Sequence, residues 1–325
     1  MADSRPAAWP LRAVTVVSCV VAGFGGLRVG AAMVRGTLVR RYGRPVRRLP
    51  DVAQVPSDAL DVIIVGDTGA VLRGLLRRPA PAYETPGPVA LVVHGWGASA
   101  ADMVPLSEPL LEAGLRVLLI DARGHGRSGD VAVASMPTFA EDLRTALRWL
   151  RRQPEIDPDR IVLVGHSVGA GAALFVAAED HAIAGVVSLS SMAAPREFMA
   201  ERLRGKLPGP LVRLALGYVE HLIGHRFVEF SPLQTIGRST APVLLVHGGL
   251  DDTVALRDAA RLHARAAGRS TLLVLPEADH ADLAAIEEGK PELLRFLRDA
   301  GVLHGGTPIA PTKLRRGPAC GPPEP

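Results

Sequence analysis

The segment Arg160-Ile-Val-Leu-Val-Gly-His-Ser-Val-Gly-Ala-Gly-Ala-Ala-Leu174 places a serine between an aliphatic run and a run of small residues. Residues 161–164 have the character of a buried strand, and the residues from Val168 onward predict a helix. The sharp turn called a nucleophile elbow needs small residues two positions before and after its serine, and here these are Gly165 and Gly169. The start of the helix then lies beneath the hydroxyl. The segment predicts Ser167 as a nucleophile; the alternative is an ordinary strand-to-helix turn that contains a serine.

Short apolar runs and helix-period segments alternate on both sides of this turn. The runs are nearly continuous in apolar character, which is typical of parallel strands buried on both faces. A hairpin of Leu60–Val65 and Ala70–Leu76, joined through Gly66-Asp67-Thr68-Gly69, precedes them. We therefore predict an α/β fold with one doubly wound, mostly parallel sheet and helices on both faces. The expected strands are Val89–Val93, Arg116–Ile120, Ile161–Val164, Gly185–Leu189, Val243–Val246 and Thr271–Leu275, and the expected helices are Met103–Ala113, Thr138–Arg152, Val168–Ala178, Val254–Ala267 and Ala281–Asp299.

One long stretch without a strand, residues 191–241, interrupts this alternation. Two helices are expected in it, Pro195–Leu203 and Leu211–Ile223, so we predict a small helical lid inserted over the carboxyl edge of the sheet. The inner face of the lid either lines an acyl pocket or only packs against the core. The second helix carries an apolar stripe formed by Leu211, Leu214, Ala215, Tyr218 and Leu222.

The first 50 residues combine an apolar run with a dense cluster of arginines. The uncharged run Ala13–Leu27 would span about 22 Å as a helix, less than the roughly 30 Å of a bilayer core. Continued to Val34, with Arg28 snorkelling to the interface, it reaches a spanning length. We therefore predict that residues 1–50 form a membrane anchor with a basic flank, so that the chain contacts the membrane through an N-terminal helix. A cleaved secretory signal and a soluble apolar helix are the alternatives.

The arginines that follow the apolar run favour a cytoplasmic position for the rest of the chain, because positive flanks tend to stay in the cytoplasm. The alternative is a secreted protein, released after cleavage of a signal. Residues 51–300 are expected to form the α/β domain. The Gly- and Pro-rich residues 301–325 are expected to form a disordered tail.

The charge balance and the cysteine count exclude several classes of protein. Residues 1–50 contain nine arginines and one acidic residue, and residues 301–325 are also basic, so the body of this +4 chain is net acidic. A nucleic-acid-binding face on the body is therefore not expected. The two cysteines, Cys19 and Cys320, do not make a disulfide scaffold, and no metal-ligand spacing is present. We expect no metal and no organic cofactor.

Further residues suited to catalysis follow other predicted strands. They lie in His94-Gly95-Trp96-Gly97, in Asp121-Ala-Arg-Gly-His-Gly-Arg-Ser-Gly129 and in His247-Gly-Gly-Leu-Asp-Asp-Thr-Val254, and His280 follows the last strand. Together with the elbow, these segments resemble the α/β-hydrolase superfamily over about residues 60–300, in its chain order of serine, acid and histidine. In detail the chain is similar to serine hydrolases of the Bem46-like, dienelactone-hydrolase-like and prolyl-oligopeptidase-like groups.

The resemblance implies a role for each matching residue. Asp251 matches the acid of the superfamily's Gly-x-x-Asp-x-x-Val pattern and would orient His280, the base for Ser167. Its neighbour Asp252 is expected to start or cap the next helix.

The resemblance also implies an oxyanion hole formed by the backbone N–H groups of Trp96 and Val168. His94 and His125 are expected to be structural. The remaining histidines are expected on the solvated surface or in the tail: His181, His221, His225, His263 and His304.

These residues predict a serine hydrolase that forms an acyl-enzyme, in which His280 takes the proton of Ser167 and returns it to the leaving group. With a membrane anchor nearby, we expect small-molecule carboxylic esters as substrates, with hydrophobic acyl groups favoured. Peptidase or acyltransferase activity on the same triad is the alternative, because the similar groups include peptidase-like members. A haloperoxidase, a C–C bond hydrolase and a non-catalytic binding protein that has kept the fold are further alternatives. The sequence leaves the oligomeric state open.

Overall fold

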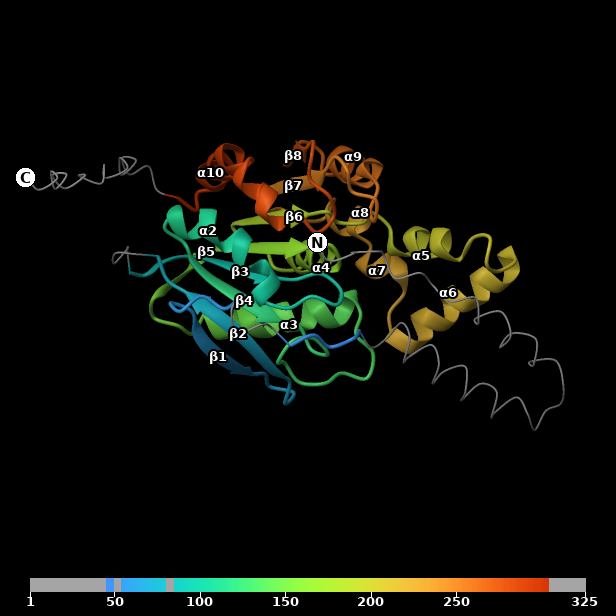
Figure 1. Ribbon diagram of the computed structural model, residues 1–325, viewed down its shortest axis with the longest axis horizontal. Coiled ribbons are helices and arrows are strands. Elements are labelled where there is room, and N and C mark those ends of the chain that lie inside the picture. Colours follow the sequence, from blue (N-terminus) through green and yellow to red (C-terminus); the bar gives the residue numbers. More distant parts are fainter. Residues whose placement is uncertain (1–44, 50–53, 80–84, 304–325) are drawn as a thin grey trace, which may run out of the picture.

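The computed structural model describes residues 45–49, 54–79 and 85–303 (Figure 1). Residues 1–44 of the predicted membrane anchor and its basic flank, and residues 304–325 of the predicted tail, lie outside these ranges. No helix within the described ranges combines the length and the apolar character that crossing a bilayer requires.

Eight strands form one sheet: β1 (Leu60–Val65), β2 (Val71–Arg77), β3 (Gly87–Val93), β4 (Arg116–Asp121), β5 (Ile156–His166), β6 (Gly185–Leu189), β7 (Val243–Gly248) and β8 (Ser270–Leu275). Their order across the sheet is β1-β2-β4-β3-β5-β6-β7-β8. β1 and β2 form the predicted antiparallel hairpin, and β2 is also antiparallel to β4, whereas all other neighbours are parallel. The predicted mostly parallel sheet is confirmed, and every predicted strand is present.

The helices that pack on the sheet are α2 (Val104–Glu112), α3 (Met136–Leu150), α4 (Val168–Ala177), α9 (Leu256–Arg265) and α10 (Lys290–Asp299), with two 3-10 helices, η5 (Ala101–Met103) and η6 (Leu283–Glu287). These helices cover both faces of the sheet. The side chains of a strand alternate between the two faces, so each strand contributes residues to a core on either side. In β3, Val89, Leu91 and Val93 pack into one core cluster with α3, α4 and α9. Ala90 and Val92 pack into the other, with α2 and α10. Burial on both faces explains why this strand is apolar throughout.

The C-terminal helix is shorter than the sequence predicts. One helix over Ala281–Asp299 is expected, but the structure has η6, a break at Glu288 and Gly289, and then α10. Pro291 lies in the first turn of α10, where a missing N–H breaks no helix hydrogen bond; inside a longer helix it would remove one. A side chain at Gly289 would press on Leu273, so the break packs directly against β8.

Four helices lie between β6 and β7: α5 (Pro195–Leu203), α6 (Gly209–Ile223), α7 (Phe227–Phe230) and α8 (Pro232–Thr235). Figure 1 shows α5 and α6 extending away from the sheet, whereas α7 and α8 return the chain to the body. Phe227 and Phe230 are buried, and both short helices contact α4. We call α5, α6 and their connection the arm.

Candidate active site

Ser167 lies at the turn between β5 and α4, at the carboxyl edge of the sheet. Its φ of 54° and ψ of −115° lie in a region that residues with a side chain rarely adopt, so the turn is strained. A Cβ at Gly165 would collide with Gly169, and a Cβ at Gly169 would collide with His94, so both positions require glycine. The Ser167 N–H donates to the Leu189 carbonyl at 2.8 Å, which ties the turn to β6. The local sequence thus places Ser167 at the carboxyl edge of the sheet, where the residue is nearly buried.

Ser167, His280 and Asp251 come together in one hydrogen-bonded chain. His280 Nε2 lies 3.1 Å from Ser167 Oγ, and His280 Nδ1 lies 2.8 Å from Asp251 Oδ2. Because a carboxylate only accepts, Nδ1 carries the proton and Nε2 accepts from the serine hydroxyl. The three residues follow β5, β7 and β8, parallel strands whose carboxyl ends share one edge of the sheet. This arrangement can take the proton of Ser167 and stabilise the imidazolium that results.

The carboxylate of Asp251 is fully buried and surrounded by donors. It accepts the N–H groups of Thr253 at 2.9 Å and Val254 at 2.8 Å, and the Ser190 hydroxyl donates to it as well. Burial alone would raise the pKa of Asp251, but the hydrogen bonds from His280, Val254 and Ser190 outweigh burial and lower the pKa to about 2. Asp251 is therefore ionised at neutral pH.

Ser190 and His247, to which the sequence reasoning assigned no role, complete this environment. Ser190 has a φ of 50° at the end of β6, and its N–H donates to the Val246 carbonyl at 2.9 Å. His247 is buried; its Nε2 donates to the Val254 carbonyl at 2.8 Å and lies 3.5 Å from Asp251 Oδ2. The segment that contains His247 was recognisable from its resemblance to the superfamily. Nothing in the sequence marks Ser190, because its contact joins two separate loops.

The prediction that Asp252 starts or caps the next helix is wrong. α9 begins at Leu256, and its N-cap residue, Ala255, makes no side-chain capping hydrogen bond. Asp252 is exposed, and its Oδ1 accepts from the Thr253 hydroxyl at 3.2 Å. The N–H groups that follow are bound by Asp251 instead, which keeps the chain in a loop for several more residues.

The segment after β3 lies directly against the elbow. A Cβ added at Gly95 would be 3.3 Å from Ser167 Cβ, so the next residue, Trp96, begins beside the serine. Val168 is the first residue of α4, where a backbone N–H has no acceptor within its own helix. The two residues expected to form an oxyanion hole therefore belong to segments that meet at Ser167.

Two buried histidines hold the segments around the serine. His94 Nδ1 donates to the Gly95 carbonyl at 2.6 Å, and its Nε2 accepts the Ala122 N–H at 3.0 Å. Burial lowers the pKa of His94 to about 4, so the ring is neutral, as these two bonds require. His166 Nε2 donates to the His280 carbonyl at 2.8 Å, and burial lowers the pKa of His166 to about 4 as well. His166 thus fixes the loop that carries His280, a contact that the sequence reasoning missed.

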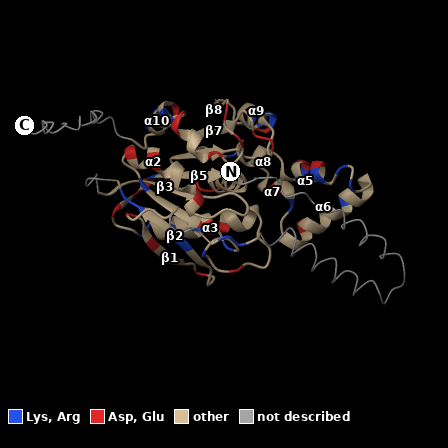
Figure 2. Cartoon of the chain, in the orientation of Figure 1, with Lys and Arg blue, Asp and Glu red and all other residues tan. Residues whose placement is uncertain are grey.

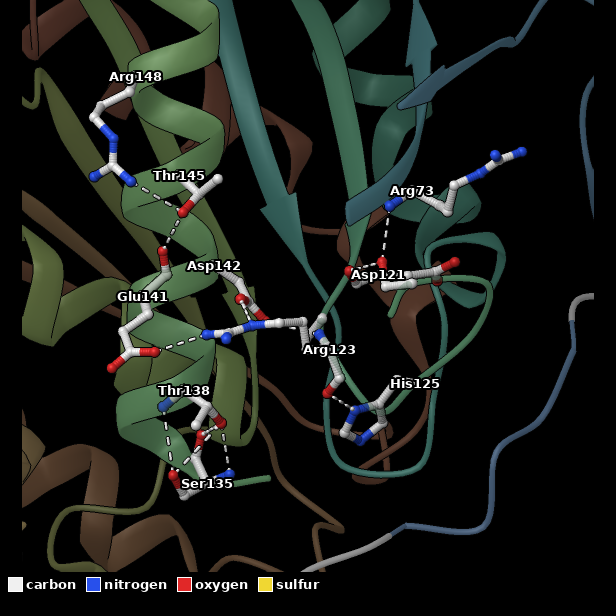
Figure 3. Close-up of polar contacts among 12 residues, drawn as sticks. Arg73, Asp121, Arg123, His125, Ser135, Thr138, Glu141, Asp142, Thr145 and Arg148 are labelled. Carbon is white, nitrogen blue, oxygen red and sulfur yellow. Dashed lines mark hydrogen bonds and ion pairs between the residues drawn. The ribbon is translucent and has the colours of Figure 1, made fainter. Parts of the chain in front are cut away.

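The loop after β4 is fixed by two buried carboxylates (Figure 3). Asp121 accepts the N–H groups of Ala100 at 2.7 Å and Arg127 at 2.8 Å. Asp142 of α3 accepts both the backbone N–H and the guanidinium of Arg123, whose side chain reaches across to α3 in Figure 3. Burial raises the pKa of Asp142 to about 6, although Arg123 opposes this shift. The pair is ionised at neutral pH and holds the loop to the body.

His125 lies in that loop, behind Trp96. Its ring is buried, 5.5 Å from the Trp96 ring, 4.9 Å from His94 and 5.1 Å from Phe139, measured between ring centroids. Burial lowers the pKa of His125 to about 4, so the ring packs as a neutral group. Its position is that of a structural residue that supports the Trp96 segment.

The remaining histidines are not part of this site. His181, His221 and His263 are exposed, and His225 is half-buried in the connection between α6 and α7. His304 lies outside the described residues. Among the residues that the structure describes, no three His, Cys, Asp or Glu side chains gather in a way that could hold a metal ion.

Comparisons with known proteins identify the family. A family model described as serine aminopeptidase, S33, matches residues 84–231. An uncharacterized protein of Mycobacterium tuberculosis is 32% identical over 266 residues, which cover 78% of this chain and 85% of the relative. An esterase of Pyrococcus furiosus superposes with a TM-score of 0.63 at 23% identity, over 80% of this chain and 98% of the esterase. Est1E from Butyrivibrio proteoclasticus gives a TM-score of 0.56 at 19% identity, over 74% and 98% of the two chains. The chain belongs to the α/β-hydrolase superfamily.

Proposed function

We propose that the protein is a serine hydrolase that cleaves carboxylic esters through an acyl-enzyme, with hydrophobic acyl groups favoured. One observation carries the proposal: the unbroken chain from Ser167 Oγ through His280 at 3.1 Å to the buried carboxylate of Asp251 at 2.8 Å. A serine hydroxyl is a weak nucleophile at its ordinary pKa and needs a base within hydrogen-bond reach. The strained backbone of Ser167 supports the same role, because such strain concentrates at functional sites.

In the proposed reaction, Ser167 Oγ attacks the ester carbonyl carbon while its proton passes to His280 Nε2, and Asp251 stabilises the imidazolium. The N–H groups of Trp96 and Val168 donate to the oxyanion, each contributing on the order of 10²–10³-fold to the rate. The C–O bond to the alcohol then breaks as His280 returns the proton to the leaving oxygen. Water then attacks the acyl carbon as His280 takes its proton. The bond between that carbon and Ser167 Oγ breaks, His280 returns the proton to Oγ, and the acid is released.

The surroundings of the serine support an apolar ester. Trp96 begins beside Ser167 and its side chain is 42% exposed, so it offers apolar surface next to the proposed oxyanion hole. Apolar side chains with a few convergent polar groups are typical of sites for small apolar ligands. The structurally similar protein from Pyrococcus furiosus is an esterase.

Labelling with a fluorophosphonate probe tests the proposal, because the probe reacts with an activated serine. Wild-type protein is expected to be labelled, and Ser167→Ala is expected to lose the label together with hydrolysis of p-nitrophenyl esters. Ser270→Ala, a serine on the opposite side of β7 from the elbow, is the control and is expected to react like the wild type. Labelling of Ser167→Ala at the wild-type rate would refute the assignment.

Aminopeptidase activity is the second candidate, because the matching family model is described as serine aminopeptidase. The same three side chains can form an acyl-enzyme from a peptide bond, with an amine as leaving group. Rates on p-nitrophenyl esters of increasing acyl length are to be compared with rates on aminoacyl p-nitroanilides. We expect the esters to be preferred; preference for the anilides would replace the ester assignment with the peptidase while leaving Ser167 in place.

A further inference from the structure

Asp251 belongs to a short loop whose hydrogen bonds are partly internal. Its Oδ1 accepts the N–H groups of Thr253 at 2.9 Å and Val254 at 2.8 Å, so residues 251–254 form one compact unit. These two bonds fix the carboxylate within the loop, but they do not fix the loop relative to His280. Contacts between the loop and the rest of the molecule must therefore set the direction of Asp251 Oδ2.

His247, near the end of β7, makes one of these contacts. Its Nε2 donates to the Val254 carbonyl at 2.8 Å and lies 3.5 Å from Asp251 Oδ2. Because a carbonyl oxygen only accepts, Nε2 carries a proton. Val254 is thus held from two sides: its N–H donates to Asp251, and its carbonyl accepts from His247.

The strand that carries His247 is a rigid base for this contact. β7 pairs with β6 on one side and with β8 on the other, and it contains no Lys, Arg, Asp or Glu, so Figure 2 draws it in tan. His280 follows β8, the neighbouring strand. A side chain on β7 can therefore hold the loop of Asp251 in a constant position relative to the loop of His280.

The two ends of the loop are fixed in different ways. At its start, the Leu250 N–H donates to the Ala278 carbonyl at 3.0 Å, a backbone contact with the segment that leads to His280. At its far end, the Val254 side chain packs in the core, and the hydrogen bond from His247 holds the backbone. His247 therefore supplies the polar contact that orients the far end of the loop.

The second ring nitrogen of His247 indicates that this bond, and not packing, accounts for the histidine. Nδ1 is buried and has no hydrogen-bond partner among the residues that the structure describes. A buried polar atom without a partner destabilises a fold, and an apolar side chain of similar size would avoid that loss. Packing alone therefore does not explain the ring, whereas the bond from Nε2 does.

We propose that His247 is a positioning residue of the triad. It holds the Val254 carbonyl, and with it the loop, so that Asp251 Oδ2 stays directed at His280 Nδ1 and the imidazole keeps the tautomer that accepts the proton of Ser167. The inference rests on the proposed function, in which these three residues act together. No bond is made or broken at His247, so its replacement should change kcat and leave substrate binding unchanged.

Three substitutions at position 247 separate the hydrogen bond from the size and polarity of the side chain. His247→Gln places an amide N–H near the position of Nε2. His247→Asn is also an amide, but it is one carbon shorter and places that group near the position of Nδ1. His247→Phe fills the space without a donor. Leu110→Ala, at a buried position in α2 outside the site, is the control for a general loss of stability.

Hydrolysis of p-nitrophenyl esters by the full-length chain is the first readout. A misplacement of about 1 Å in an active site lowers the rate by up to about 100-fold. We therefore expect kcat to fall on the order of 10–100-fold in His247→Phe and His247→Asn, with KM unchanged. His247→Gln should keep most of kcat. Leu110→Ala should unfold at a lower urea concentration and keep the kcat and KM of the wild type.

A second readout does not depend on catalysis. The hydrogen-bonded proton on His280 Nδ1 gives a one-proton NMR signal at higher frequency than the backbone amides, and its loss in His280→Gln assigns it. We expect this signal to move toward the amide region or to broaden in His247→Phe and His247→Asn. It should stay in place in His247→Gln and Leu110→Ala.

Two outcomes would overturn the proposal. One is a kcat or an NMR signal in His247→Phe equal to that of the wild type. The other is an equal loss of kcat in His247→Gln, His247→Asn and His247→Phe, which would show that the ring is needed for packing only. A wild-type protein that neither hydrolyses esters nor reacts with a fluorophosphonate would instead refute the proposed function. The NMR signal would then still decide whether His247 holds Asp251 against His280.

Discussion

Two backbone N–H groups, the Ser190 hydroxyl and His280 stabilise the buried charge of Asp251. In Asp251→Asn, the amide can present an N–H to His280 Nδ1, which favours the tautomer with its proton on Nε2 and leaves no acceptor for Ser167. We therefore expect kcat for ester hydrolysis to fall on the order of 10⁴-fold. Asp252→Asn, the exposed neighbour, is the matched control and should leave kcat unchanged. Comparable losses in both variants would show that Asp251 has no special role.

The lowered pKa of Asp251 also links stability to pH. The pKa is about 2 in the folded protein against an ordinary value of 3.8, so the ionised carboxylate contributes stability that is present above the ordinary value and lost as pH falls through the folded one. The difference corresponds to about 2 kcal/mol. In urea unfolding, the wild type should therefore lose about 2 kcal/mol more than Asp251→Asn between about pH 4 and pH 2. Parallel losses in the two proteins would contradict this account.

Two helix glycines offer a test of how tightly the elements around the serine are packed. A Cβ at Gly169, in the first turn of α4, would collide with the carbonyl oxygen of His94, whereas a Cβ at Gly217 in α6 would meet no atom within 4 Å. Gly217→Ala should raise the free energy of unfolding by about 0.5–1 kcal/mol, because alanine is the better helix former. Gly169→Ala should lower the free energy of unfolding and reduce fluorophosphonate labelling, because the backbone at His94 or at the start of α4 must move to make room for the methyl group.

Urea unfolding and labelling rates measure the two effects on the same samples. Opposite signs at the two positions are the expected result. Gly171→Ala provides a third point, because its Cβ would press on the flexible end of Met136 rather than on backbone, so its effect should be smaller than that of Gly169→Ala. Equal effects at Gly169 and Gly217 would mean that the contact between α4 and the segment after β3 is loose.

The same elements show how far the sequence predicts the structure. Strands buried on both faces are apolar throughout, so the apolar runs predict their positions. The glycines on either side of Ser167 predict the elbow and its serine. The sequence does not predict the break before α10, because apolar residues continue at helical spacing across it. Pro291 is the main residue that argues against one continuous helix. The contacts of Ser190 with Asp251 and of His166 with His280 join loops that are distant in the chain, and sequence spacing contains no information about them.

Helix α6 illustrates a different limit. Apolar residues occupy most of its circumference, so the helical period alone does not decide which face packs on the body. The structure buries Val212 and Leu216, not the stripe through Leu214 and Tyr218. Helix α6 contacts α5, and Phe198 and Leu203 of α5 pack against the same core cluster as Val212 and Leu216, so the buried face depends on packing partners that the helical period does not encode.

Across the whole molecule, charge is distributed so that the N-terminal 50 residues are strongly basic and the body is acidic. Residues 1–44 lie outside the described residues, and the role of the N-terminal segment stays a prediction from sequence: the apolar run 13–34 anchors the chain, with the arginines that follow it on the cytoplasmic side. An acidic body gains nothing from an anionic membrane surface by itself. Attachment would therefore depend on the basic end of the chain.

Cell fractionation of the full-length chain tests the anchor. It should remain with membranes in alkaline carbonate, which strips proteins held by charge alone, and deletion of residues 13–34 should release it. Replacing four of the flanking arginines by glutamine should weaken the preference for the cytoplasmic side without releasing the protein, because the apolar run, not the charge, provides the insertion energy. Protease added to intact spheroplasts should spare the body and should digest it after lysis. Recovery of the full-length chain in the carbonate-soluble fraction would refute the anchor, and digestion in intact spheroplasts would reverse the orientation.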